Sequence, residues 1–294
     1  MRQAILAGWL ADRIFGDPAR FHPVAGFGRA ALALERLVWR PSRAAGVVHT
    51  AALVAAAAAL GRQSKLGPRA LVVWTALGGR SLESAAVALG SALAAGDIAR
   101  ARALAPTLVG RDPSELDAGE LSRATVESVA ENTSDAVVAP LLWAAIGGAP
   151  AVAAYRAINT LDAMVGHKDE RYREFGWAAA RLDDVVNWPA ARLTALLTIG
   201  AAPLVGGSPA AAWRAAWTDG RLHPSPNAGR VEGAFAGALG IRLGGVNRYT
   251  HGIERRADLG VGTPPTVADI SRSVTLARIV SIAALAVAIL VARR

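Results

Sequence analysis

The sequence predicts an all-α, polytopic membrane protein with four to five membrane-spanning helices. Some of these helices are expected to be broken by proline or glycine, with polar helical or loop segments between them. Three observations predict this class. Hydrophobic residues make up 53% of the 294 residues and charged residues only 19%, below the roughly 25% that is usual for soluble domains. Four stretches with little or no charge approach the ~20 residues that a helix needs to cross a bilayer. No strand-turn-strand pattern persists, so we expect one helical membrane domain over residues 1–294.

Each expected span is an apolar stretch bounded by polar residues. In chain order the spans lie near residues 44–60, 66–79, 136–155, 193–213 and 274–292. The second is the shortest, and it counts as a span only if its flanking arginines extend to the interface. Pro140, Gly147, Gly148 and Pro150 interrupt the third span, and Pro203 and Gly206-Gly207 interrupt the fourth. A buried alanine-rich helix in a soluble bundle is the alternative for any one stretch, but four together favour a membrane, where broken helices are tolerated around a protein-lined cavity.

The segments between the spans are polar. Residues 81–123 have the pattern of an amphipathic soluble helix, residues 156–192 are dense in charge, and residues 219–272 have the composition of a loop with short helices. The chain has no cysteine, which excludes disulfides, thiolate zinc sites and a cysteine nucleophile. A bound metal would therefore be held by oxygen or imidazole, which favours Mg²⁺. The net charge is +9, yet no basic run alternates with aromatic residues, so nucleic acid is not an expected partner.

A first group of chemically useful residues lies in E-S-V-A-E-N-T-S-D, residues 127–135. At about 100° per residue, Glu127, Glu131 and Asp135 share one face of a helix. Three carboxylates on one face repel one another unless a cation lies among them, so this spacing favours a Mg²⁺ site, with Asn132 as a neutral ligand or substrate contact. A solvated acidic surface is the alternative. The motif leads directly into an apolar span, where acidic groups are costly to keep without a function.

A second and a third group flank the charged segment. Tyr155, Asn159 and Asp162 fall on one face of an expected helix, although asparagine and aspartate are also typical of helix ends. Further on, Asp183 and Asp184 each lie one turn before Asn187 in R-L-D-D-V-V-N. Lys168 and the arginines here, Arg192 among them, could bind phosphate groups, and a surface helix rich in salt bridges is an equally good interpretation of the pattern.

A fourth group is the stiff turn H-P-S-P-N-A-G, residues 223–229. Prolines on either side of Ser225 fix an extended backbone, and His223 and Asn227 are set on this rigid frame. A single histidine is more often structural than catalytic. The sequence contains no phosphate-binding loop of the G-x-x-x-x-G-K-[ST] type, so ATP would have to bind by another route.

Taken in order, these motifs closely resemble the CobD/CbiB family, the adenosylcobinamide-phosphate synthases of cobalamin biosynthesis. The resemblance runs from Asp12 to about Tyr249, and two of its motifs, E-S-V-A-E-N-T-S-D and H-P-S-P-N-A-G, are specific. The other motifs are D-R-I-F-G-D-P at 12–18, H-P-V at 22–24, G-R-D at 110–112, N-T-L-D-A-M at 159–164 and R-L-D-D-V-V-N at 181–187. Arg156 departs from the pattern, because lysine is frequent there in relatives, and arginine keeps the charge with a different geometry.

The resemblance implies an inner-membrane ligase. It would use MgATP to join adenosylcobyric acid to (R)-1-amino-2-propanol O-2-phosphate, or to a related aminoalcohol phosphate, through an acyl phosphate. Four carboxylates would then be catalytic, and the first three would bind Mg²⁺: Glu127, Glu131, Asp135 and Asp184. The substrates would contact Arg111, Asn132, Tyr155, Arg156, Asn159, Asp162, Lys168, Asn187, Arg192, His223, Ser225 and Asn227. Within that set the cations Arg111, Arg156, Lys168 and Arg192 would hold phosphate groups.

The expected partners are the corrinoid and aminoalcohol phosphate substrates, membrane lipid, and other membrane-bound enzymes of the pathway. We expect a multi-pass protein of the inner membrane with its active loops in the cytoplasm, because ATP is supplied there. Two other classes stay open: a non-catalytic sensor similar to AmpE-type membrane proteins, and a corrinoid transporter. A transporter would suit the broken helices, but no inverted repeat is visible and the longest polar segments lie between the spans.

Overall fold

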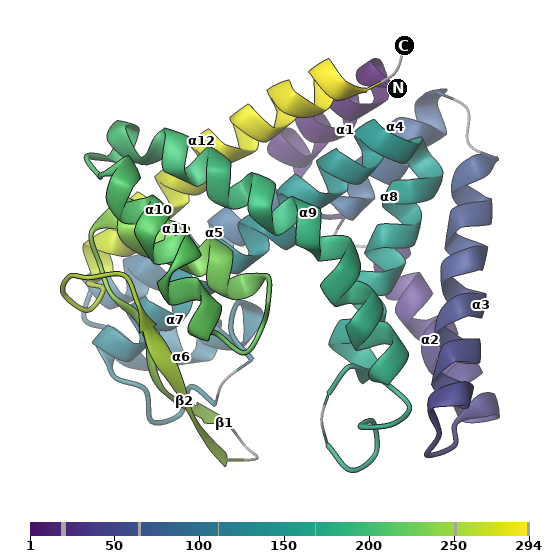
Figure 1. Ribbon diagram of the computed structural model, residues 1–294, viewed down its shortest axis with the longest axis horizontal. Helices are drawn as coiled ribbons and strands as arrows, with labels where there is room; N and C mark the ends of the chain where they lie inside the picture. Colours follow the sequence, from purple (N-terminus) through teal and green to yellow (C-terminus); the bar gives the residue numbers. More distant parts are fainter. Residues whose placement is uncertain (19–21, 64–65, 111, 168, 250–251, 293–294) are drawn as a thin grey trace. The chain divides into compact units, whose positions relative to one another are not determined.

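The structure is a computed structural model that describes residues 1–18, 22–63, 66–110, 112–167, 169–249 and 252–292 (Figure 1). The chain divides into two compact units, each of which is described by itself. Unit 1 comprises Met1–Arg80, Asp135–Trp188 and Leu285–Arg294, and unit 2 comprises Ser81–Ser134 and Pro189–Ala284. Both are built mainly from helices, which confirms the predicted all-α class.

Unit 1 is a group of helices packed around the long helix α8. Its elements are α1 (Arg2–Phe15), α2 (Pro23–Val38), α3 (Arg43–Arg62), α4 (Leu66–Ala76), α8 (Ala139–Val165), the first half of α9 (Trp177–Ala201) and the end of α12 (Val267–Val291). Helices α2, α3 and α4 all contact α8, and the core between them includes Leu53, Leu161 and Phe175. His49 of α3 is fully buried against the Phe175 ring, and its Nε2 lies 3.0 Å from the Ala31 carbonyl of α2. A polar side chain thus joins two apolar helices through a hydrogen bond.

Helix α8 is broken in the middle, as its prolines and glycines predict. Gly148 has φ +71° and ψ −159°, far from helical values, and Pro150 follows two residues later. A positive φ is strained for residues with a Cβ, and proline removes a backbone donor, so together they interrupt the hydrogen-bond ladder. The helix is therefore two helical segments that meet at a kink.

Unit 2 combines short helices with one β-hairpin. Its helices are α5 (Gly79–Ala94, from Ser81 onward), α6 (Ile98–Leu104), α7 (Ala118–Thr133), α10 (Pro209–Trp217), α11 (Ala228–Leu239) and the remaining parts of α9 and α12. Single turns of 3₁₀-helix cover Ala105–Thr107, Ala202–Val205 and Asp219–Leu222. A π-helical turn, Ser134–Val138, follows α7 and belongs to unit 1 from Asp135 onward. Helix α7 begins at a reciprocal cap in which Asp117 Oδ1 accepts from the Glu120 amide at 2.8 Å and Glu120 Oε2 accepts from the Asp117 amide at 3.0 Å.

The hairpin corrects the expectation of loop and short helices over residues 219–272. Strands β1 (Leu243–Tyr249) and β2 (Gly252–Leu259) pair in antiparallel fashion, from Leu243 opposite Leu259 to Tyr249 opposite Gly252. Between the pairs Leu243–Leu259 and Gly245–Arg256, β1 has one residue, Gly244, and β2 has two, so β2 has a β-bulge opposite Gly244. Consecutive glycines in one strand and consecutive charged residues in the other hide the two-residue alternation that predicts a strand.

Four of the described helical segments are long and apolar enough to cross a membrane: Arg43–Arg62, Ala118–Val165, Trp177–Val205 and Val267–Val291. They cover the predicted spans near 44–60, 136–155 and 274–292. Helix α4 has only 11 residues, and it is not among the four. The predicted span at 193–213 is wrong in its second half, because the chain turns at Gly206, in the left-handed conformation, and α10 starts anew after Ser208.

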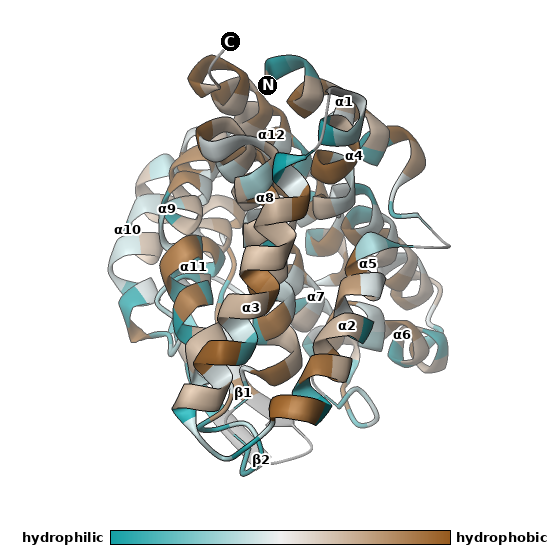
Figure 2. Cartoon of the chain, turned by 90° about the vertical axis from the view of Figure 1, so that its right-hand side faces the viewer, coloured by the Kyte–Doolittle hydropathy of each residue, from teal (hydrophilic) through white to brown (hydrophobic). Residues whose placement is uncertain are grey.

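The surfaces of the spans also fit a bilayer. Figure 2 shows α3 as apolar along most of its length, and Val47, Val48 and Leu60 on this helix are 45%, 59% and 72% exposed. The charge within the last span, Arg278, is neutralised in unit 2 by Glu83 of α5, with Nε 2.7 Å from Oε2. An apolar exposed surface and a paired internal charge are both expected of a helix in lipid.

Candidate functional site

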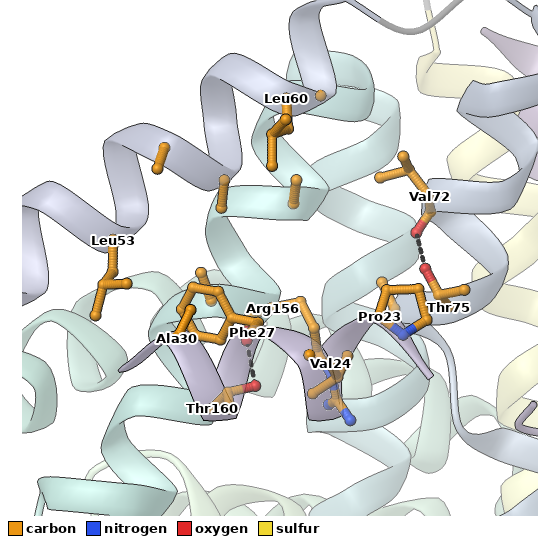
Figure 3. A pocket seen from close by; sticks show the side chains of 17 residues that line it. Pro23, Val24, Phe27, Ala30, Leu53, Leu60, Val72, Thr75, Arg156 and Thr160 are labelled. Atoms are coloured by element: carbon orange, nitrogen blue, oxygen red, sulfur yellow. Dashed lines mark hydrogen bonds between the residues drawn. The ribbon is translucent and has the colours of Figure 1, made fainter. Parts of the chain in front are cut away.

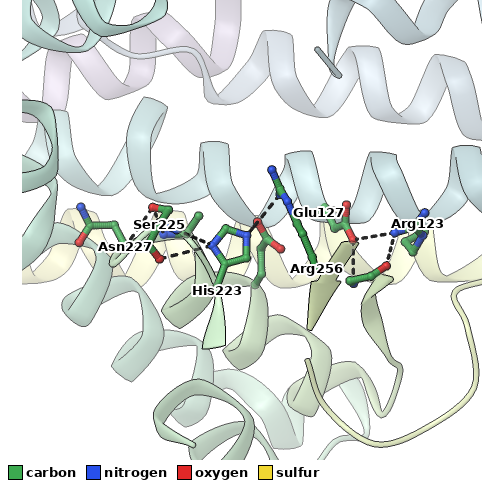
Figure 4. Close-up of polar contacts among 9 residues, drawn as sticks. Arg123, Glu127, His223, Ser225, Asn227 and Arg256 are labelled. Carbon is green, nitrogen blue, oxygen red and sulfur yellow. Dashed lines mark hydrogen bonds and ion pairs between the residues drawn. The ribbon is translucent and has the colours of Figure 1, made fainter. Parts of the chain in front are cut away.

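Helix α7 holds the hairpin of unit 2 through an arginine and a glutamate one turn apart. Arg123 Nη2 donates to the Val246 carbonyl at 2.8 Å, and Nη1 donates to the Gly244 carbonyl. Glu127 Oε1 accepts from the Gly244 amide at 2.9 Å and lies 3.6 Å from Arg123 Nη1 (Figure 4). Both side chains are largely buried, with 13% and 5% of their surfaces exposed. Glu127 therefore has a structural role, since it satisfies the Gly244 amide of the hairpin.

The predicted magnesium site is not assembled by its three carboxylates alone. Among the residues that the structure describes, no three aspartate, glutamate or histidine side chains are grouped as a metal site would require. Asp135 belongs to the π-helical turn Ser134–Val138 and to unit 1, whereas Glu127 and Glu131 lie on α7 in unit 2. Asn132 turns back to its own helix and donates to the Ser128 carbonyl at 2.9 Å. Glu131, by contrast, is exposed.

The turn before α11 is rigid, as its prolines predict. Ser225 Oγ accepts from the amides of Asn227 and Ala228 at 3.3 and 3.1 Å, and the Ser225 amide donates to His223 Nδ1 at 3.0 Å (Figure 4). His223 is buried, and its Nε2 lies 3.3 Å from Arg256 Nη1 and 3.8 Å from Glu232 Oε1. His223 thus connects the turn to α11 and to β2, which is a positioning role.

Two arginines flank the start of α11. Arg192 Nη1 donates to Asn227 Oδ1 at 2.7 Å, so the asparagine at the N-cap position is bound to a guanidinium and does not cap the helix with its side chain. Arg230 Nη1 donates to the carbonyls of Ala216 and Trp217 at 2.9 and 3.1 Å, and its guanidinium lies 5.3 Å from the centre of a Trp217 ring. Burial, followed by the nearby charge of Arg221, lowers the pKa of Arg230. Two cations at a helix N-terminus form a site suited to a phosphate group. We call Arg192, Ser225, Asn227 and Arg230 the α11 anion site.

Unit 1 contains a second polar group, which we call the α8–α9 cluster. Tyr155 is buried, and its hydroxyl lies 2.8 Å from the Asp135 carbonyl and 2.9 Å from Asn187 Oδ1, so its one proton is shared between two acceptors. Asn187 Nδ2 donates to Asp183 Oδ2 at 2.9 Å, and Asn159 Nδ2 lies 3.4 Å from Asp183 Oδ1. The structure therefore joins three of the predicted substrate contacts through a carboxylate that the prediction did not include.

Asp184 is not part of the hydrogen bonds that define this cluster, and its catalytic assignment stays a prediction. Asp184 pairs with Arg181 at 3.6 Å, and the two side chains are 35% and 68% exposed. Asp183 is four residues before Asn187 and Asp184 only three, and the bond forms across four. Contacts across three and four residues are both common on a helix, so the spacing alone does not choose between the two aspartates.

Two other predicted residues, Asp162 and Arg156, lie beside the α8–α9 cluster. Asp162 lies near the end of α8, where its carbonyl accepts from the Gly166 amide at 2.7 Å. Arg156 donates from Nη1 to Asn159 Oδ1 at 3.2 Å and lines an apolar cavity. Arg111 and Lys168 lie outside the described residues, and their assignment to phosphate groups stays a prediction.

The fold and these polar groups define a class: a multi-pass helical membrane protein with buried polar clusters and a cationic helix N-terminus. The chain belongs to the CobD/CbiB family, since the family model described as CobD/Cbib protein matches residues 5–277. No solved structure matches the chain.

Relatives from distant bacteria share most of the chain, and the three that follow are each named cobalamin biosynthesis protein CobD. The protein from Mycobacterium tuberculosis is 51% identical over 298 residues, which cover 99% of this chain and 95% of the relative. That from Geobacter metallireducens is 47% identical, with 83% and 82% covered. That from Klebsiella pneumoniae is 41% identical, with 95% and 93% covered. The similarity therefore covers more than four fifths of each of these proteins.

Proposed function

We propose that this protein is an ATP-dependent ligase that forms an amide bond. It would join the carboxylate of adenosylcobyric acid to the amine of (R)-1-amino-2-propanol O-2-phosphate, or a related aminoalcohol phosphate, and release adenosylcobinamide phosphate. Membership of the CobD/CbiB family assigns the chain to cobalamin biosynthesis, and the names of its relatives agree. The reaction itself is inferred from the resemblance of the motifs and from the chemistry of the sites.

The proposed reaction has two steps. A carboxylate oxygen of the corrinoid attacks the γ-phosphorus of ATP, and ADP leaves. The free amine then attacks the carbonyl carbon of the acyl phosphate, inorganic phosphate leaves, and a base accepts the proton that the amine loses. Such chemistry needs cations to hold phosphate groups and a positioned base.

The observation that carries the proposal is the α11 anion site. Arg192 binds Asn227 at the N-terminus of α11, Arg230 belongs to the first turn of this helix, and the Pro-Ser-Pro turn fixes the backbone there. Guanidinium groups bind phosphate oxygens through charge-assisted hydrogen bonds. A phosphate of ATP or of the aminoalcohol substrate would bind at this site, with Asn227 orienting it.

The reaction also requires a base that accepts the proton of the amine, and the carboxylates of the first motif are the candidates. Glu131 is the exposed carboxylate of the first motif, so we assign the proton-accepting role to it. Glu127, Glu131 and Asp135 do not fit a magnesium site made by protein alone, since no such group of three exists among the described residues. We therefore propose no step that passes through a protein-bound metal.

The test is a reconstituted reaction with the purified protein in nanodiscs. Adenosylcobyric acid, aminopropanol phosphate and MgATP are supplied, the corrinoids are read by mass spectrometry, and ADP is measured in parallel. We expect adenosylcobinamide phosphate with one ADP formed per product. A folded preparation that binds the corrinoid and forms no product would contradict the ligase and favour a carrier or a sensor.

A further inference from the structure

Unit 1 contains a cavity of about 430 Å³ between α2, α3, α4 and α8 (Figure 3). Its volume falls within the ~300–1,000 Å³ that is usual for small-molecule sites. Apolar side chains dominate the lining, among them Val24, Phe27, Leu53, Leu60 and Val72. Of the described residues that line it, Arg156 alone carries a charge. An occupant would therefore be mostly hydrocarbon, with one group that a guanidinium can bind.

Arg156 is poorly compensated in this setting. Its Nη1 donates to Asn159 Oδ1 at 3.2 Å, while its Nε is buried and has no hydrogen-bond partner in the described part of the chain. Arg156 is half-buried, and a guanidinium with an unused buried donor favours an anion at this position. The N-terminus of α2 adds a favourable field, because Pro23 and Val24 in its first turn also line the cavity.

The cavity also reaches the outer surface of a candidate span. Leu60 of α3 lines it and is 72% exposed, and the same helix presents apolar side chains along its exposed surface. Hydrocarbon chains of the bilayer would surround such a helix. An amphiphilic molecule whose hydrocarbon chain enters the cavity beside Leu60 would exchange lipid contacts for protein contacts. Its polar group would then lie near Arg156.

We propose that this cavity binds an anionic membrane lipid, with an acyl chain in the apolar part and the headgroup phosphate on Arg156. The site goes beyond the ligase reaction and uses other residues than the α11 anion site. A small aminoalcohol phosphate has too little hydrocarbon to fill an apolar cavity, and a corrinoid is too large for it. Arg156 would then bind the phosphate of a lipid and not, as the sequence predicts, the phosphate of a substrate. The two phosphates carry the same kind of charge.

The first experiment needs no variant. The full chain is purified and delipidated in detergent, and its thermal unfolding is followed while three probes are titrated separately. These are lyso-phosphatidylglycerol, lyso-phosphatidylcholine with the same acyl chain, and glycerol 3-phosphate. We expect the anionic lipid to raise the Tm and to bind about tenfold or more tightly than the neutral lipid, as a hydrogen bond to a charged group predicts. Glycerol 3-phosphate should have no effect at the same concentrations.

Substitutions then locate the site. Arg156→Gln should remove the preference for the anionic lipid, Arg156→Lys should keep part of it, and Ala57→Trp should fill the cavity and weaken both lipids. Arg62→Gln is the matched control, because Arg62 is an exposed arginine on α3 that does not line the cavity. Equal affinity for the two lipids in the unmodified protein, or a preference that survives in a folded Arg156→Gln protein, would overturn the proposal. Stabilisation by glycerol 3-phosphate alone would overturn it as well, in favour of a small phosphate ligand.

Discussion

At the scale of single residues, the α11 anion site makes the sharpest prediction. Arg192→Gln removes the cation bound to Asn227, and we expect the KM for one phosphate-bearing substrate to rise about 10- to 100-fold, the range for a lost charged hydrogen bond. Arg214→Gln is the control, because Arg214 is an exposed arginine on α10 outside the site. Initial rates with ATP and the aminoalcohol phosphate varied in turn would show which substrate binds there. Unchanged KM values for both would exclude Arg192 from the site.

The two glutamates of the first motif should behave differently. Glu131→Gln keeps the shape of an exposed side chain and removes its charge, so we expect ligation to fall about 100-fold or more, as for a lost general base, with little change in Tm. Glu127→Gln can still accept from the Gly244 amide but loses its charge against Arg123, so we expect a lower Tm and a retained rate per folded molecule. Rates and thermal unfolding of both variants provide the test. Full activity in Glu131→Gln would remove that residue from the mechanism.

The neighbouring residues Asp183 and Asp184 should differ in how much they contribute to stability. Asp183→Ala leaves the amides of Asn159 and Asn187 without their acceptor, and we expect the free energy of unfolding to fall by about 1–3 kcal/mol. Asp184→Ala removes an exposed ion pair with Arg181, which is worth at most about 1 kcal/mol. Denaturant unfolding in detergent measures both. A larger loss in Asp184→Ala than in Asp183→Ala would contradict the α8–α9 cluster.

These residues show what the sequence can predict of a site. Their spacing along helices predicts Tyr155, Asn159 and Asn187 as site residues, and the structure brings the three together. The choice between Asp183 and Asp184 depends on how α9 is rotated against α8, which packing decides. The structural role of Glu127 was missed because its partner, Gly244, lies far along the chain in an unpredicted strand.

At the scale of elements, Gly244, which lies opposite the β-bulge of the hairpin, is tightly constrained. Gly244 has φ +93°, and a Cβ there would lie 2.2 Å from the Ala257 carbonyl oxygen. Gly244→Ala therefore combines an unfavourable backbone conformation with a steric clash, and we expect a loss of more than about 2 kcal/mol and faster proteolysis of the hairpin. Gly240→Ala is the matched control, because Gly240 also has a positive φ, +68°, but a Cβ there would meet no heavy atom within 4 Å. We expect this variant to lose about 1 kcal/mol. Similar losses in both variants would show that the bulge is not held as described.

The helices and the hairpin differ in how far their sequences determine them. Long apolar segments such as Val267–Val291 specify a helix through their own composition, and the kink at Gly148 follows from a local glycine and proline. Strand β1, in contrast, has a glycine pair and is held by Arg123 and Glu127, about 120 residues earlier in the chain. The end of the span at Gly206 is also determined by local sequence, because a glycine that can adopt the left-handed conformation is followed by Pro209, which starts the next helix. The predicted span at 193–213 nevertheless runs through this turn, since the apolar composition continues on both sides of it.

At the scale of the whole molecule, the ligase proposal requires the α11 anion site to face the cytoplasm, where ATP is available. The absence of cysteine makes the chain a clean background for single-cysteine labelling. Leu222, 68% exposed in the turn that leads to the anion site, reports on that side of the membrane. Leu290, 77% exposed within the span Val267–Val291, is the control that lipid should shield.

We expect a membrane-impermeant maleimide to leave Leu222→Cys unlabelled in intact spheroplasts and to label it in inside-out vesicles. Leu290→Cys should stay unlabelled in both and react only after detergent is added. Labelling of Leu222→Cys in intact spheroplasts would place the α11 anion site outside the cell. ATP could not reach it there, so the phosphate bound by Arg192 and Arg230 would have to come from another molecule, and the ligase mechanism would need a different nucleotide site.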